Sequence, residues 1–270
     1  MTRRRSLPLM LATLLTVPTA VAAITLVSVE QEIAIGQQAN AQVRKDVPEV
    51  SDAQVTAYVR GLGQRLVRHA PGPKYPYSFT VANYREINAF ALPGGPVWVH
   101  RGLMHAAANE SQLAGVLAHE VAHIAQRHAA DQLTKGMVAN GFLSVLGAFL
   151  GNSGGAGVAQ MAAGLLTNGV FLKFSRDDES EADRVGLQIM RSAGWDGRGM
   201  VELFEILRRE QGSSPGVPSF LSSHPSPADR ITRLQADVAR SRGGARDSQQ
   251  FQSIKARLLR LSPPRAMPRR

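Results

Sequence analysis

The spacing of apolar positions predicts a chain built mostly of helices. Over long stretches, apolar side chains recur every three or four residues, which places them on one face of a helix. The stretches with this period are residues 30–46, 52–69, 110–133, 177–193, 200–211, 228–240 and 249–261. Pro48 ends the first of these helices, and Ser51-Asp52 offers an N-cap to the second.

The alternation typical of strands is confined to the stretch between the second and third helices. Residues 77–81 alternate in this way, and a hairpin follows in which 88–92 and 97–100 flank the turn Pro93-Gly94-Gly95. The sequence therefore predicts an α+β fold, mostly α, with a small β-sheet.

The first 23 residues have the pattern of a secretory signal peptide. Arginines at positions 3–5 precede an apolar run from 7 to 21, and Ala20-Val21-Ala22 forms a small-x-small cleavage site before Ala23. The run contains two prolines and is shorter than the roughly 20 residues of a spanning helix, which argues against an uncleaved anchor. We expect the mature chain to be exported and, in a bacterium, to lie in the periplasm.

A second apolar segment interrupts the helical pattern. Residues 136–172 carry no charged side chain, and the glycine-rich stretch 152–157 divides them into two arms that are each short for crossing a bilayer. A hairpin over 137–172, buried or lying at a membrane surface, fits this pattern better than two spanning helices. Peripheral contact with a membrane is therefore expected rather than insertion.

Composition and charge narrow the class of protein. The absence of cysteine excludes a disulfide scaffold, thiolate zinc sites, a cysteine nucleophile and a lipidated cysteine anchor. The formal net charge is +10, but residues 3–5 and 240–270 hold it, and the body between them is close to neutral. A nucleic-acid-binding protein would spread this charge over its folded body, so no nucleic acid partner is expected. The basic tail 257–270 is expected to be solvated and partly disordered, and contact with an anionic membrane surface is the alternative.

The clearest chemical signal lies in the helix predicted over 110–133. His119, Glu120 and His123 form the sequence H-E-x-x-H, and the two histidines, four apart, stand one turn apart on the same helical face. Two neutral imidazoles so placed can share one tetrahedral zinc ion, and Glu120 can act as the general base for an attacking water. The small and apolar neighbours argue against two exposed histidines that match the motif by chance.

A catalytic zinc site also needs a third protein ligand and an open position. His128 stands at the wrong spacing to extend the motif in the metzincin manner. The acidic run 177–183 offers alternatives. Within it Glu179 and Asp183 share a helical face, whereas Glu181 points away. From the residues alone the choice among these acids stays open, because acids at a helix start also complement the helix dipole.

Further motifs accompany the zinc signature in a fixed order. They are Asn-Ala-Phe-Ala-Leu-Pro-Gly-Gly-Pro-Val at 88–97 with Arg-Gly-Leu at 101–103, Ser-Arg-x-x-Glu-x-x-Ala-Asp at 175–183, and Ser-His-Pro at 223–225 with Arg-Ile at 230–231. With H-E-x-x-H they resemble the peptidase family of the CAAX prenyl proteases and the HtpX-type membrane proteases. The resemblance covers roughly residues 30–240 and is greatest to the periplasmic branch of β-barrel assembly-enhancing proteases.

This resemblance assigns roles to the residues of the zinc site. It implies one zinc ion per chain, with His119, His123 and Glu179 as ligands. Glu120 becomes the catalytic base. Asp183 falls where the family places an acid against a ligand histidine.

The resemblance also assigns residues to the substrate. The strand Asn88, Ala89, Phe90, Ala91 and Leu92 looks like the edge that borders the active-site cleft and aligns an extended peptide by strand addition. His224 and Arg230 resemble a pair that approaches the metal or stabilises the oxyanion. His224, next to Pro225, also fits an ordinary position at the entry to a helix.

Two departures from the family pattern bear on architecture. Integral relatives carry spanning helices where this chain has 137–172, and larger periplasmic relatives append tetratricopeptide repeats, for which the residues after 240 are too few. We therefore expect a peripheral protein with one gluzincin-type zinc metalloprotease domain over 24–240, followed by a basic helix and tail over 241–270.

The resulting prediction is a zinc metalloendopeptidase that cleaves misfolded or stalled envelope and outer-membrane proteins in protein quality control. The alternative is a latent protease, or a non-proteolytic periplasmic chaperone or assembly factor, with the same zinc fold. An intact Glu120 argues against the chaperone, because a structural zinc site needs no general base. A latent form would have His224 or another group in the open zinc position.

Overall fold

The computed structural model describes residues 25–139, 173–210, 220–224, 227–240 and 243–268. The expected signal peptide at 1–23 lies outside the described residues, as do residues 140–172 of the predicted apolar hairpin. Within the described ranges, no helix has both the length and the apolar character needed to span a bilayer.

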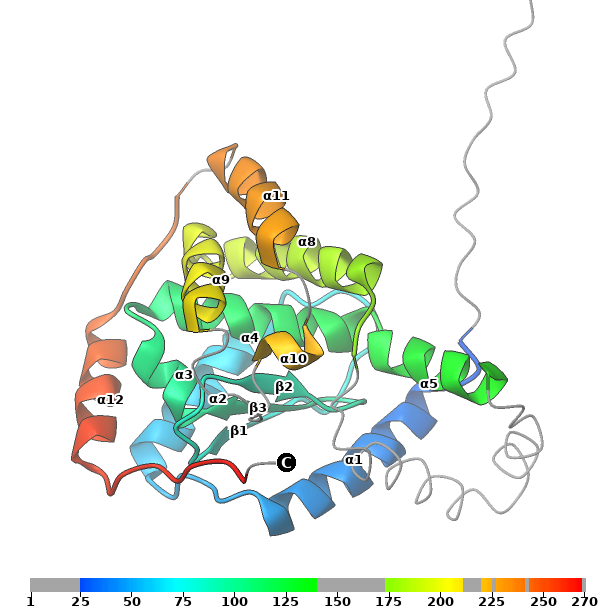
Figure 1. Cartoon of the computed structure of the whole chain (residues 1–270), viewed down its shortest axis with the longest axis horizontal. Helices are drawn as coiled ribbons and strands as arrows, with labels where there is room; N and C mark the ends of the chain where they lie inside the picture. Colours follow the sequence, from blue (N-terminus) through cyan, green and yellow to red (C-terminus); the bar gives the residue numbers. More distant parts are fainter. Residues whose placement is uncertain (1–24, 140–172, 211–219, 225–226, 241–242, 269–270) are drawn as a thin grey trace, which may run out of the picture.

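A three-stranded sheet with the order β1-β3-β2 lies between helices (Figure 1). Strand β1 (Ser78–Ala82) pairs in parallel with β3 (Pro96–His100), and β2 (Ala89–Ala91) pairs with β3 in the antiparallel direction. Gly94 and Gly95 make the turn between β2 and β3 with φ values of 70° and 131°, which favour glycine. The strand β2 is an edge of this sheet.

The alternation along β3 gives the sheet two buried faces. Val97 and Val99 belong to the main core, which α2 (Ala53–Val67) and α4 (Glu110–Ala125) share. Trp98 belongs to a second cluster on the other side, where α1 (Val29–Asp46) packs across the sheet. The predicted small sheet within a mostly helical chain is confirmed.

Helix α4 is the central helix, and all of its residues are buried. Helices α8 (Arg176–Ser192) and α9 (Arg198–Glu210) pack on it, so that α4 lies between these helices and the sheet (Figure 1). A Cβ at Gly115 would lie 2.7 Å from Met200 Cα, so the approach of α4 to α9 requires glycine there. The H-E-x-x-H motif therefore lies at the centre of the molecule.

Within the described ranges, five further helices surround this arrangement. They are α3 (Arg101–Ala106), α5 (His128–Ala139), α10 (Phe220–Ser223), α11 (Pro227–Ala239) and α12 (Gln249–Arg260). The sequence pattern predicts neither α3 nor α10, because helices of six and four residues are too short to show a periodicity.

The single helix predicted over 110–133 is wrong, because the structure divides it into α4 and α5. Arg127 between them has a φ of 63°, in the left-handed region, which turns the chain away from the axis of α4. Its guanidinium donates to Glu32 Oε2 at 3.1 Å and to Val27 O at 2.5 Å. Glu32 is buried and also accepts a hydrogen bond from the Tyr75 hydroxyl at 2.8 Å. Distant residues thus hold a conformation that the local sequence does not favour.

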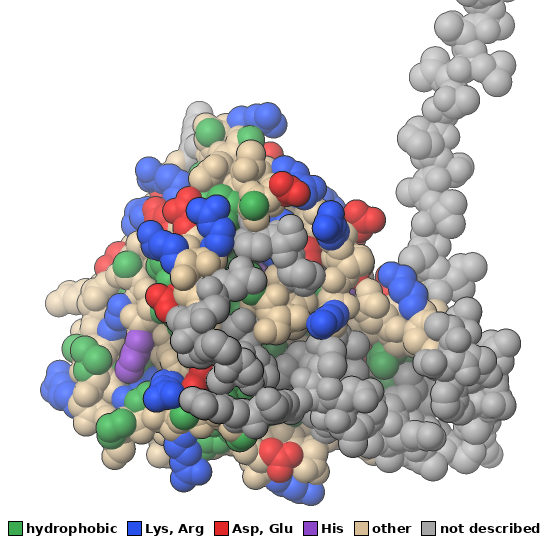
Figure 2. Space-filling model, viewed as in Figure 1, with side chains coloured by type: hydrophobic (Ala, Val, Ile, Leu, Met, Phe, Trp, Pro, Cys, Tyr) green, Lys and Arg blue, Asp and Glu red, His purple; other side chains and the backbone are tan. Residues whose placement is uncertain are grey.

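The C-terminal segment packs on the body of the protein. Phe251, Ile254 and Leu258 of α12 join the main core. Beyond α12, the Arg265 amide donates to Asn83 O, and the Arg265 carbonyl accepts from the amide of residue 85, both at 2.9 Å. These contacts hold the described residues up to 268 against the body, while most side chains beyond α12 are exposed, as expected of a solvated tail. On the face shown in Figure 2, Lys and Arg side chains are interspersed with Asp and Glu.

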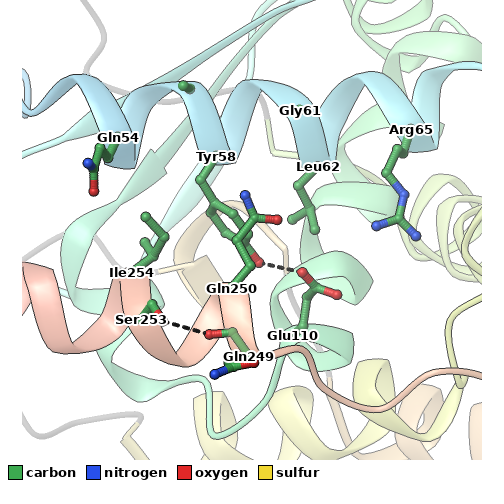
Figure 3. Close-up of a pocket in the computed structure, with 11 residues that line it drawn as sticks. Gln54, Tyr58, Gly61, Leu62, Arg65, Glu110, Gln249, Gln250, Ser253 and Ile254 are labelled. Atoms are coloured by element: carbon green, nitrogen blue, oxygen red, sulfur yellow. Dashed lines mark hydrogen bonds between the residues drawn. The ribbon is translucent and has the colours of Figure 1, made fainter.

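A groove of about 700 Å³ lies between α2 and α12 (Figure 3). The Glu110 carboxylate, at the start of α4, contributes to its lining and accepts three hydrogen bonds. These come from the Tyr58 hydroxyl at 2.8 Å, the Ser248 hydroxyl at 2.9 Å and the Trp195 indole at 3.0 Å. One side chain therefore links α2, α4, the turn after α8 and the N-cap of α12.

Candidate metal centre

Helix α4 presents His119 and His123 on one face, one turn apart. Their Nε2 atoms are 3.0 Å from each other, and both side chains are buried. The remaining positions of the helix are mostly apolar and pack against the sheet, α8 and α9. The histidine pair is therefore held inside the protein.

Helix α8 brings a carboxylate to this pair. Ser175 and Asp178 form a capping box that fixes the start of α8, and Glu179 in the first turn faces α4. The Glu179 oxygens lie 3.5 Å from His119 Nε2 and 3.4 Å from His123 Nε2. The side chain of Glu181 is 46% exposed. Of the acids among which the local sequence could not choose, the structure places Glu179 against both histidines.

His224, directly after α10, completes the cluster. Its Nδ1 lies 2.9 Å from Glu179 Oε1 and 3.3 Å from His119 Nε2. The Phe220 ring stacks on the His224 imidazole with centroids 4.2 Å apart. The short helix α10, which no sequence pattern predicts, therefore positions the fourth group.

These four groups fit one zinc ion. Their donor atoms all lie within 4.8 Å of one another. The separations of 2.9–3.5 Å are close to the edge of about 3.3 Å that nitrogen and oxygen ligands form around tetrahedral zinc. Burial lowers the pKa of His119, but hydrogen bonds to Asp183 and Glu179 outweigh it and raise this pKa to about 9. Burial holds the pKa of His123 well below its ordinary value, which keeps this imidazole neutral, the form that binds a metal.

A row of polar contacts lies behind His119. Its Nδ1 is 3.0 Å from Asp183 Oδ1, and Arg230 donates to both Asp183 oxygens at 2.7 Å. Burial raises the pKa of Asp183, but hydrogen bonds from Arg230 and His119 outweigh burial and hold this pKa below its ordinary value. The guanidinium also lies 2.5 Å from Glu179 Oε2. The structure therefore places Arg230 against two carboxylates of the centre.

Glu120 lies beside the cluster. Both of its carboxylate oxygens are buried and lack a hydrogen-bond partner among the described residues, and Oε1 is 3.5 Å from His224 Nε2. Burial raises the pKa of Glu120, and the nearby His224 and His119 offset part of this effect. A carboxylate with a raised pKa suits a group that takes up a proton and releases it again.

Aromatic rings cover the histidines. Phe174 stacks on His123 with ring centroids 3.9 Å apart and an interplanar angle of 26°, and Phe220 stacks on His224 as described. Sequence reasoning misses both rings, because each is a single aromatic residue without a recognisable local pattern. These contacts restrict the rotation of the two imidazoles.

The strand that the sequence assigns to substrate borders the helix of the motif. The side chains of Ala89 and Ala91 pack toward the main core, whereas Phe90 and Leu92 belong to the cluster on the α1 side. Asn88, just before the strand, is buried, and its Oδ1 has no partner among the described residues. The edge strand β2 packs against α4, which carries Glu120.

The sequence has clear relatives. The sequence model of Peptidase family M48 matches residues 53–238, more than half of the chain. The β-barrel assembly-enhancing protease of Escherichia coli (strain K12) is 35% identical over 240 residues, which cover 86% of this chain and 49% of that relative. The mitochondrial metalloendopeptidase OMA1 of Schizosaccharomyces pombe is 33% identical over 180 residues, which cover 67% of this chain and 52% of that relative. The chain spans about half the length of these curated relatives.

Proposed function

The chain belongs to peptidase family M48, whose members depend on zinc, and on that premise we propose that it is a zinc metalloendopeptidase. The family predicted from the sequence motifs is thereby confirmed. The observation that carries the proposal is the buried cluster in which His119, His123 and Glu179 direct donor atoms to one point. This ligand set is that of a gluzincin, with two histidines from the motif and a glutamate from a later helix.

Each residue around the zinc position is assigned a separate role in the reaction. Zinc bound there would act as a Lewis acid on the scissile carbonyl. Glu120 takes a proton from the attacking water and passes it to the leaving amine, a role suited to its raised pKa. The Asp183 carboxylate lies 3.0 Å from His119 Nδ1 and favours the tautomer with its proton on that nitrogen, so that Nε2 keeps its lone pair for the metal. Arg230 holds Asp183 in place and balances the charge of Glu179.

The edge strand is proposed to position the substrate. Residues 88–92 lie next to α4, and an extended peptide that adds to β2 would run past Glu120. The alternation along β2 supports this role in part, since Ala89 and Ala91 are small and lie on the α4 side.

His224 favours a second candidate, a protease that is latent at rest. With His224 Nδ1 beside His119 and Glu179, four protein groups surround the metal position, whereas a catalytic zinc site keeps one position open. In this candidate the His224 side chain, whose Nε2 lies 3.5 Å from Glu120 Oε1 at rest, moves aside when substrate enters.

The proposed substrates are unfolded or misassembled proteins of a bacterial envelope. Support comes from the names of the relatives, which include β-barrel assembly-enhancing proteases. The signal-like sequence at 1–23 supports export to the periplasm, and the uncharged sequence at 137–172 supports peripheral contact with a membrane.

The decisive experiment compares the purified protein with Glu120→Gln on casein and on an unfolded outer-membrane protein, with zinc measured in both. The glutamine keeps the size of the side chain but cannot accept the proton. We expect equal zinc content and a cleavage rate lower by about 10²- to 10⁴-fold in the variant. Equal cleavage by both proteins would contradict the role of Glu120.

His224→Ala in the same assay separates the remaining candidates. Faster cleavage with zinc retained would favour the latent protease, and slower cleavage with zinc retained would favour a role of His224 in the reaction. No cleavage by any of the three proteins, with zinc bound, would favour the non-proteolytic chaperone.

A further inference from the structure

His128, the first residue of α5, lies buried beside the metal centre. The residue is 2% exposed, and its Nδ1 is 2.9 Å from Nδ1 of His123. Its other nitrogen, Nε2, is 3.4 Å from Glu181 Oε2. A continuous row of polar groups therefore runs from the metal position through His123 and His128 to Glu181. The mechanism above uses neither His128 nor Glu181.

The break between α4 and α5 makes this contact possible. In a continuous helix, residues five apart stand about 140° apart around the axis, so His128 would point away from His123. Arg127, with its φ of 63°, redirects the chain and brings the two rings together. Buried Glu32 holds Arg127 in this strained conformation. A strained residue next to a site points to a functional reason for the strain, which here is the placement of His128 against His123.

The tautomers of the two imidazole rings determine the direction of the hydrogen bond between them. Two ring nitrogens 2.9 Å apart need one donor and one acceptor. When His123 Nε2 binds a metal, the proton of its neutral imidazole is on Nδ1, so His123 donates and His128 Nδ1 accepts. The proton of His128 is then on Nε2, facing the Glu181 carboxylate.

We propose that His128 is a positioning residue, which fixes the tautomer and the ring orientation of the zinc ligand His123. It does for His123 what Asp183 does for His119, with an imidazole in place of a carboxylate next to the ligand. Glu181 anchors the outer end and is itself paired with Arg184 at 3.2 Å. The inference rests on the proposed function, in which His123 binds zinc.

The test measures the zinc dissociation constant of the purified protein by competition with a chromogenic chelator. His128→Phe keeps a ring of similar size but removes both nitrogens, and we expect the zinc dissociation constant to rise about 10- to 100-fold. His128→Asn offers an amide oxygen near the place of Nδ1, and we expect it to restore most of the zinc affinity. Glu181→Gln should have a smaller effect than His128→Phe, because Glu181 is half-exposed.

His100→Phe is the matched control, since His100 is equally buried but packs against Tyr84 and Phe90, away from the cluster. It should bind zinc as the parent does. The melting temperature of each zinc-free variant is also measured. A merely structural role would lower it in His128→Phe and leave the zinc affinity unchanged, which would overturn the proposal.

His123→Ala distinguishes the failure of this inference from that of the proposed function. If His123→Ala binds zinc as tightly as the parent, the ligand set and the proposed function fail. If His123→Ala loses zinc while His128→Phe binds zinc normally, only the positioning role is overturned. The positioning role is also overturned if His128→Asn and His128→Phe lower the zinc affinity equally. If His128→Phe does not fold, His128→Gln replaces it, because its longer amide leaves His123 Nδ1 without an acceptor.

Discussion

Arg230 is the residue on which the charge balance of the centre depends. It is 4% exposed, donates to both oxygens of Asp183 and lies 2.5 Å from Glu179. Without it, two buried carboxylates would face each other with no permanent cation between them. Removal of one partner from a buried ion pair is costly, because the charge that remains is neither paired nor hydrated.

Arg230→Met should therefore destabilise the zinc-free protein by about 3–5 kcal/mol. Saturating zinc should narrow this difference, because the ion supplies positive charge beside Glu179. Urea unfolding with a chelator and with zinc measures both effects. Arg240→Met is the control, since the ion pair of Arg240 with Asp237 is long and exposed. If Arg230→Met lowers the free energy of unfolding no more than Arg240→Met does, the prediction is contradicted.

His100 gives the fold a dependence on pH that is separate from the metal centre. Burial lowers the pKa of His100 to about 4 from its ordinary value of 6.5, and the contact of Nδ1 with Glu86 O at 3.2 Å offsets little of this. The folded protein thus keeps His100 neutral, while the unfolded chain takes up a proton below pH 6.5. Neutral His100 therefore contributes fully to the free energy of unfolding above pH 6.5, and this contribution is lost as the pH falls toward 4.

His100→Gln, which cannot titrate, should remove this part of the pH dependence. Between pH 7 and pH 5 the parent should lose about 2 kcal/mol more unfolding free energy than the variant. Chemical denaturation at both pH values measures the difference. Parallel losses in the two proteins would show that His100 is not the titrating group.

At the scale of elements, Glu110 joins helices that are far apart in the sequence. Its carboxylate accepts hydrogen bonds from Tyr58 in α2, Trp195 after α8 and Ser248 before α12. The Arg65 guanidinium lies 3.9 Å from the centroid of the Trp195 ring, which adds a further link between α2 and this turn. This carboxylate therefore adds hydrogen bonds to the apolar packing that holds α12 on the peptidase core.

Glu110→Ala should destabilise the protein by about 3 kcal/mol, because two buried donors and one half-buried donor lose their acceptor. Thermal and urea unfolding measure this loss. Glu49→Ala is the matched control, since Glu49 pairs with Arg44 at 2.6 Å on the surface and its removal should change stability little. Similar losses in the two variants would contradict the role given to Glu110.

At the scale of the whole molecule, the sequence predicts contact with a membrane through one segment. Deletion of 137–172 should shift the protein from the membrane fraction to the soluble fraction, because this segment is the longest uncharged stretch of the chain. Fractionation of cells that express each form, with the signal sequence kept, measures the shift. An unchanged distribution would contradict the surface hairpin.

The sequence by itself determined the family, the small sheet and most of the helices with long periodic patterns, but not the break within 110–133. It also gave the histidine pair, since residues four apart on a helix share a face whatever surrounds them. Local spacing could not choose between Glu179 and Asp183, because both lie on the same face of α8. Only the family resemblance distinguished them before the structure.

The tertiary structure decided what depends on residues far apart in the chain. The break at Arg127 needs Glu32, the end of the tail needs the segment around Asn83, and the fourth group of the centre needs α10. Packing between α4, α5 and α8 alone joins His128 to His123 and to Glu181. Local periodicity reports which face of an element is buried, whereas the partners on that face depend on packing between elements, which no local pattern contains.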